Sequence, residues 1–147
     1  MRHFGLVTFL GLLLIAAACE ENEVSPTSQK LVGTWQLYEY GWSPGSGYFV
    51  EEVPSVPAQT ITFGSNGTVD VKGEQLGFFD SHRQYRLVSD STQATDYVAF
   101  SSSGADESVA YITLLTPDSL TLSPPCFEGC HYGFVRVNQP TVPKDNF

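Results

Sequence analysis

Apolar and polar residues alternate one by one along much of the chain after Lys30. Between residues 59 and 72, two short segments with this pattern flank Gly64-Ser65-Asn66-Gly67. A period of two is typical of β-strands with one buried and one wet face, because successive side chains point to opposite sides. Asn-Gly between two such segments is a strong hairpin signal. These residues therefore predict a β-hairpin.

The same pattern predicts further strands along the chain. In the first strand, Trp35 and Leu37 share one face. Residues 41–58 are expected to form a long loop, because their three prolines suit a central strand poorly. Helix is expected only as a turn near residues 28–31. The eight expected strands are residues 34–40, 59–63, 68–72, 84–88, 96–100, 108–115, 119–123 and 131–137.

Eight short strands with turn residues between them and almost no helix predict an all-β domain. We expect an antiparallel, eight-stranded up-and-down β-barrel, with an antiparallel β-sandwich as the alternative. The chain of 147 residues is long enough for one domain with a substantial core. Its aromatic content of 13% suits side chains packed on pleated faces.

The N-terminus follows a different pattern. Arg2 precedes an uncharged apolar run over residues 4–18, which ends in three alanines directly before Cys19. This is the layout of a secretory signal, and the run is shorter than the roughly 20 apolar residues of a spanning helix. With a cysteine at the cut, it resembles a bacterial lipoprotein signal, which implies lipid attachment at Cys19. A cleaved signal without lipidation is the alternative.

The acidic residues after Cys19 resemble the surface-export tag of lipoproteins of the Bacteroidota. This resemblance implies a protein anchored by lipid to the outer membrane, and leaves open whether it faces the periplasm or the cell surface. The solvated start of a linker is the other interpretation. We expect a signal peptide (residues 1–18), a flexible tether (19–29), a barrel domain (30–138) and a C-terminal tail (139–147).

Charge excludes one class of partner. The formal net charge is −9, and no cluster of basic residues offsets it. A nucleic-acid backbone would be repelled by such a surface. We therefore expect no nucleic acid among the partners.

The chain contains three cysteines, an awkward number for an exported protein. If Cys19 carries lipid, Cys126 and Cys130 remain, and an oxidising compartment allows them to form a disulfide. So small a loop gains only about 2 kcal/mol and would mainly fix the shape of one turn. Two alternatives to the disulfide combine the two cysteines with His131. One is a site for a soft metal ion, and the other is a haem attachment motif, although the spacing is one residue longer than in that motif. We expect the disulfide, with no metal and no cofactor.

Gly33-Thr34-Trp35, at the start of the first strand, resembles the Gly-x-Trp start of lipocalins and related calycin barrels. The resemblance implies a lipocalin-like barrel in which Trp35 lies across the closed end. It also implies that Arg136, in the last strand, packs over the indole, a contact worth about 0.5 to 2 kcal/mol. Further similarity to the lipocalin-like domains of Bacteroidota lipoproteins lies in residues 31–37, 61–63, 66–67 and 118–122.

The sequence contains no catalytic motif. After removal of the signal, His82 and His131 are the only histidines, and neither belongs to a Gly-x-Ser-x-Gly or zinc-protease pattern. The paired acids Glu51 and Glu52 would point to opposite faces of a strand, so they are poorly placed as an acid/base couple. We expect a protein that is not an enzyme and has no catalytic residues.

Two functions fit these features. In the first, the barrel holds a small apolar ligand and the loop of residues 41–58 acts as a lid. In the second, side chains fill the barrel, which then acts through its surface as an interaction or inhibitor module with a protein partner. The candidate ligand-binding residues are Trp42, Tyr48, Phe49, Tyr97 and Tyr111.

Overall fold

The computed structural model describes residues 26–90, 95–102 and 107–137. Cys19 and the segments expected as a signal peptide and a C-terminal tail therefore lie outside the described residues. The described chain is all-β with two short helical segments, α1 (Pro26–Leu31) and η1 (Glu74–Leu76). The strands are β1 (Gly33–Trp42), β2 (Phe49–Glu52), β3 (Thr60–Phe63), β4 (Val69–Lys72), β5 (Gln84–Asp90), β6 (Thr95–Ser101), β7 (Ser108–Leu115), β8 (Ser119–Ser123) and β9 (Cys130–Arg136).

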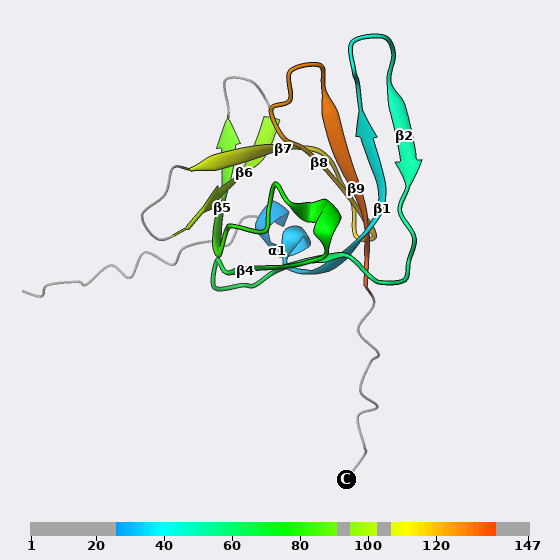
Figure 1. Cartoon of the computed structure of the whole chain (residues 1–147). Helices are drawn as coiled ribbons and strands as arrows, with labels where there is room; N and C mark the ends of the chain where they lie inside the picture. Colours follow the sequence, from blue (N-terminus) through cyan, green and yellow to red (C-terminus); the bar gives the residue numbers. More distant parts are fainter. Residues whose placement is uncertain (1–25, 91–94, 103–106, 138–147) are drawn as a thin grey trace, which may run out of the picture.

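The strands form one antiparallel, nearly closed barrel, which confirms the expected fold class (Figure 1). Neighbours follow the order β4-β3-β1-β9-β8-β7-β6-β5. A single bridge between Thr68 and Gln84 joins the two ends of this order. Beside it, the Val69 N–H donates to the Arg83 carbonyl at 3.0 Å and the Tyr85 N–H donates to the Gly67 carbonyl at 2.8 Å.

The expectation of an uninterrupted loop over residues 41–58 is wrong, because β1 extends to Trp42 and residues 49–52 form β2. β2 pairs with the C-terminal half of β1, and β3 pairs with the N-terminal half along the same edge. Nine strands thus occupy eight positions around the barrel. The prolines at 54 and 57 lie between β2 and β3, where their missing N–H groups cost no ladder hydrogen bond.

A bulge in β1 decides which of its side chains face outward. The register against β9 shifts between Leu37 and Glu39. Trp35 and Leu37 point into the core before this shift, and Tyr40 packs against the core after it. Because an extra residue in one strand changes the alternation, Glu39 comes to lie on the outer wall.

The helix α1 closes the barrel at the start of β1. The Trp35 indole N–H donates to the Leu31 carbonyl at 2.8 Å, and both side chains are fully buried. The Arg136 guanidinium lies 4.0 Å from the centre of the Trp35 ring and donates to the carbonyls of Val32 and Lys30. The basic residue of the last strand thus lies over the indole, where the lipocalin resemblance places it. The helix also begins within the segment expected as a tether.

Two tyrosines, the partly buried Tyr85 and the buried Tyr132, make the free energy of unfolding depend on pH in the alkaline range. Burial raises the pKa of Tyr85 and of Tyr132 above the ordinary value of 10.0. The folded chain therefore holds these protons more tightly than the unfolded chain, so the stabilisation is complete below pH 10 and is lost as the pH rises through the folded-state pKa values. We expect the free energy of unfolding in urea to fall above about pH 10. Tyr132→Phe should weaken this decline, and an unchanged slope in that variant would contradict the assignment.

Candidate functional site

Side chains occupy the interior of the barrel. Trp35, Phe63, Phe79, Phe100 and Phe134 are all fully buried. The Phe79 ring, which comes from the connection between β4 and β5, packs 5.3 Å from the Phe100 ring. The Phe63 and Phe100 ring centres are 6.2 Å apart. Aromatic side chains that could have lined a ligand cavity are in contact with one another instead.

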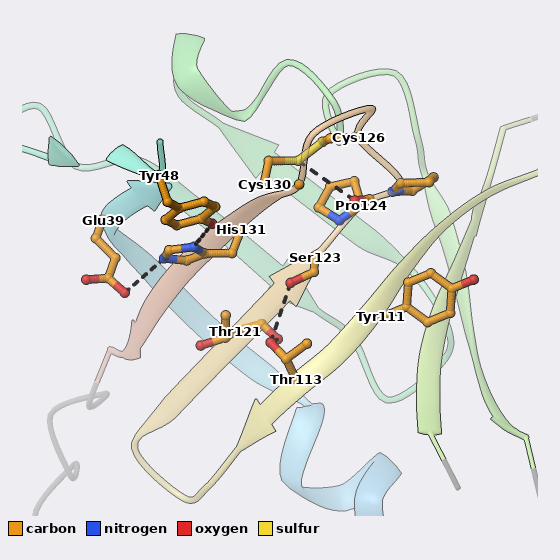
Figure 2. Close-up of a pocket in the computed structure, with 12 residues that line it drawn as sticks. Glu39, Tyr48, Tyr111, Thr113, Thr121, Ser123, Pro124, Cys126, Cys130 and His131 are labelled. Carbon is orange, nitrogen blue, oxygen red and sulfur yellow. Dashed lines mark hydrogen bonds and ion pairs between the residues drawn. A yellow bond between two sulfur atoms is a disulfide. The ribbon is translucent and has the colours of Figure 1, made fainter. Parts of the chain in front are cut away.

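A groove of about 550 Å³ lies on the outer wall, over β1, β9, β8 and β7 (Figure 2). On β8, Leu120 and Leu122 point into the core, so the alternating Thr121 and Ser123 face outward into the groove. We call this hollow the outer groove. Tyr48 lies toward one side of it and Tyr111 toward the other, as Figure 2 shows.

Tyr48, His131 and Glu39 form a continuous network at one side of the outer groove. The Tyr48 hydroxyl is 2.5 Å from His131 Nδ1, and His131 Nε2 is 3.2 Å from Glu39 Oε1. In the neutral tautomer that satisfies both contacts, Tyr48 donates to Nδ1 and the Nε2–H donates to Glu39. The Tyr48 and His131 rings are also stacked, with planes 12° apart. Burial is the main cause that raises the pKa of Tyr48, followed by the nearby Tyr40 and Glu39.

Two glycines provide the space in which this network lies flat against the sheet. Gly41 is the cross-strand partner of His131, and Gly133 is the partner of Glu39. A Cβ atom on Gly41 would overlap the imidazole of His131, and one on Gly133 would come within 2.8 Å of Glu39 Oε1. Glycine weakens a strand interior and often marks close approach of another group. The pair therefore indicates a built site.

Cys126 and Cys130 lie at disulfide distance, with Cα atoms 5.8 Å apart, and their loop borders the outer groove (Figure 2). Their neighbour His131 contacts Glu39 and Tyr48. Within the part of the chain that the structure describes, no group of three His, Cys, Asp or Glu residues is placed to hold a metal ion.

The five candidate ligand residues separate into two groups. The Trp42 and Phe49 rings stack at 5.4 Å where β1 and β2 meet, next to Tyr48. Tyr97 and Tyr111 are cross-strand partners on β6 and β7, with ring centres 6.1 Å apart. The sequence had not linked these residues with Glu39, His131, Thr113, Thr121 and Ser123. Gly133, a glycine inside an expected strand, was the available signal.

The hairpin of β1 and β2 and the cysteine loop together expose an apolar surface. Phe127 is 100% exposed, Val50 54%, Tyr48 52% and Phe49 48%. The two loops are joined, because the Ser43 N–H donates to the Gly129 carbonyl at 3.2 Å. Phe49 and Val50 are successive residues of β2, so they point to opposite faces of the hairpin. We call Tyr48, Phe49, Val50 and Phe127 together the end surface.

No family model, curated protein or solved structure matches this chain. The antiparallel, nearly closed barrel is consistent with a calycin-like fold. Among the described residues, none of the helices has the length and apolar character needed to cross a bilayer.

Proposed function

We propose that this protein is a lipid-anchored recognition module of the outer membrane, whose filled barrel binds a protein partner through the end surface. The observation that carries the proposal is the exposure of four large apolar side chains on two joined loops, above an interior that is already packed. Aromatic anchors of this kind dominate the binding energy of protein interfaces.

The position of the end surface suits a tethered protein. The chain enters the barrel through α1, at the start of β1, and the end surface lies beside the last residues of the same strand, where Phe49 pairs with Trp42. Ten residues of strand span roughly 30 Å. In Figure 1 the hairpin of β1 and β2 projects away from α1. An anchor at Cys19 would therefore leave the end surface facing away from the bilayer.

Charge indicates the kind of partner. The segments that carry the end surface, residues 37–58 and 119–135, contain no lysine or arginine. Glu51, Glu52 and Glu128 are exposed within them. An anionic lipid surface would be repelled, whereas a protein surface with apolar pockets and a basic rim would be attracted. We therefore propose a partner with basic charge around its contact site.

Site-specific photocrosslinking in the cells that make the protein tests this proposal. A photoreactive residue at Phe127 should yield one main crosslinked protein, while the same residue at Val135, which is exposed on β9 away from the hairpin, should not. With the purified partner, Phe49→Ala combined with Phe127→Ala should weaken binding by about thirtyfold or more. Val135→Ala is the matched control. Equal crosslinking from both positions, or unchanged affinity of the double variant, would contradict the proposal.

Carriage of a small apolar molecule inside the barrel stays a prediction from sequence. It would require the aromatic core around Phe79 and Phe100 to open, since both rings are fully buried. The packed interior is the reason that we favour recognition through the surface.

A further inference from the structure

We propose that the outer groove is a binding site for a neutral saccharide. This inference goes beyond the protein contact at the end surface, because it rests on the outer barrel wall. The two sites share Tyr48, but Glu39 and Tyr111, which the test changes, lie outside the end surface. Three features carry it: a site that is already formed, a row of hydroxyl groups, and exposed aromatic rings on its two sides.

The site is organised before any ligand arrives. The bonds of His131 to Tyr48 and Glu39 fix both of its ring nitrogens. The cross-strand glycines Gly41 and Gly133 hold the network close to the sheet. The volume of about 550 Å³ falls within the range of sites for small molecules. Groups fixed in this way lose little conformational entropy on binding.

Hydroxyl groups line the floor of the groove between the two tyrosines, as Figure 2 shows. Thr113 on β7 and Ser123 on β8 place their hydroxyl oxygens 3.5 Å apart, and Thr121 lies beside them. A hydroxyl both donates and accepts hydrogen bonds. Because the contact between Thr113 and Ser123 is long, a ligand hydroxyl at 2.7–2.8 Å would compete with it effectively.

These groups argue against other ligand classes. A purely apolar ligand would remove water from the hydroxyls and from Glu39 without replacing their hydrogen bonds. An anionic ligand would meet the Glu39 carboxylate and a chain with a net charge of −9. A ligand with many hydroxyls and no charge satisfies donors and acceptors alike. It also suits the carboxylate, which accepts hydrogen bonds strongly.

The aromatic rings account for the apolar part of such a ligand. Tyr111 is 40% exposed and Tyr48 is more exposed still, although one Tyr48 face is stacked on His131. The faces of aromatic rings carry partial negative charge and a large apolar area. The C–H groups on one face of a sugar ring are apolar and slightly positive, so they pack favourably on such a face. A saccharide has both polar edges and an apolar face, so it matches the hydroxyl groups and the aromatic rings of the groove.

An array of neutral and acidic oligosaccharides, probed with the full chain, tests the inference. The tightest neutral oligosaccharide is then titrated by isothermal calorimetry. Glu39→Gln should weaken binding by about tenfold or more, because a charged acceptor is lost while the side-chain shape is kept. Tyr111→Ala should weaken it by a similar factor without touching the network of Tyr48, His131 and Glu39.

Two matched controls accompany these variants. Asp70→Asn removes an exposed carboxylate on β4, and Val135→Ala shortens an outward side chain of β9 with nearly the same exposed fraction as Tyr111. Both should bind as the wild type does. The inference is overturned if no neutral saccharide binds, if acidic saccharides bind best, or if Glu39→Gln and Tyr111→Ala bind as tightly as the controls. Unchanged melting curves show that the variants fold.

Discussion

Trp35→Ala is expected to lower the free energy of unfolding by about 3 to 5 kcal/mol. The indole is fully buried, its N–H donates to the Leu31 carbonyl at 2.8 Å, and the Arg136 guanidinium covers its face at 4.0 Å. Alanine would leave a void, would leave the Leu31 carbonyl without the indole hydrogen bond, and would remove the ring that the Arg136 guanidinium covers. Because domains are stable by only about 5 to 15 kcal/mol, the loss is large. Urea unfolding followed by circular dichroism measures it.

Tyr38→Ala is the control for this substitution. Tyr38 lies on the same strand but is 40% exposed, whereas Trp35 is fully buried, so the loss of the Tyr38 ring should cost less stability. A second variant, Arg136→Gln, should reduce stability by an intermediate amount, since it removes the charge over the ring but keeps the indole buried. If Trp35→Ala and Tyr38→Ala lowered the free energy of unfolding by the same small amount, the contacts of Trp35 with Leu31 and Arg136 would not stabilise the fold as proposed.

Phe79→Ala is expected to cost a similar amount, about 3 to 5 kcal/mol, and to leave a cavity where the Phe79 ring packs. The Phe79 ring is fully buried, and its centre lies 5.3 Å from that of Phe100 and 5.1 Å from that of Tyr132. An apolar void of this kind stays dry and binds benzene. We therefore expect benzene to shift NMR signals of core methyl groups in the variant and to leave the wild type unchanged.

Phe78→Ala provides the comparison for Phe79→Ala. Phe78 packs edge-on against Phe79, with ring centres 4.9 Å apart, but it is only partly buried. Its truncation should open little enclosed space and give no benzene-binding cavity. Benzene uptake by the wild type equal to that of Phe79→Ala would show an existing cavity, and carriage of an apolar ligand would then become the favoured function.

Much of the fold could be predicted from the sequence because alternation has a direct physical cause. One face of each strand meets the core, so positions such as Leu120 and Leu122 must be apolar at every second residue. The turn at Asn66-Gly67 was equally readable, since Gly67 has a positive φ of 80° that favours glycine. Strand positions followed from these local rules, and β7 and β8 have the bounds that were expected.

β2 and the bulge in β1 could not be predicted from the alternation of apolar residues or from turn residues. β2 is exposed at all four positions, so it carries no alternating burial signal. The bulge between Leu37 and Glu39 depends on pairing with β9, far along the chain. Without it, the alternation from Trp35 and Leu37 would place Glu39 inside the barrel. Local sequence patterns do not reveal such long-range register.

The outer groove could not be predicted from the sequence, because its residues come together only through long-range strand pairing. His131 was a candidate only as a neighbour of the cysteines, whereas its partners Glu39 and Tyr48 lie 92 and 83 residues away. The sequence does mark both aromatic walls, as Tyr48 and Tyr111 were candidates for ligand contact. It assigned Tyr48 to a lid loop over the barrel and Tyr111 to the lining of a ligand pocket, whereas the structure places both beside the outer groove.

Native mass spectrometry of the full chain, purified from its own cells in mild detergent, tests the central claim most directly. We predict the mass of an acylated chain beginning at Cys19, two hydrogens lighter for the Cys126–Cys130 disulfide, with no apolar small molecule retained. Partial unfolding in the gas phase should then release nothing from the barrel. A stoichiometric apolar ligand that leaves only when the chain unfolds would contradict the claim that side chains fill the interior.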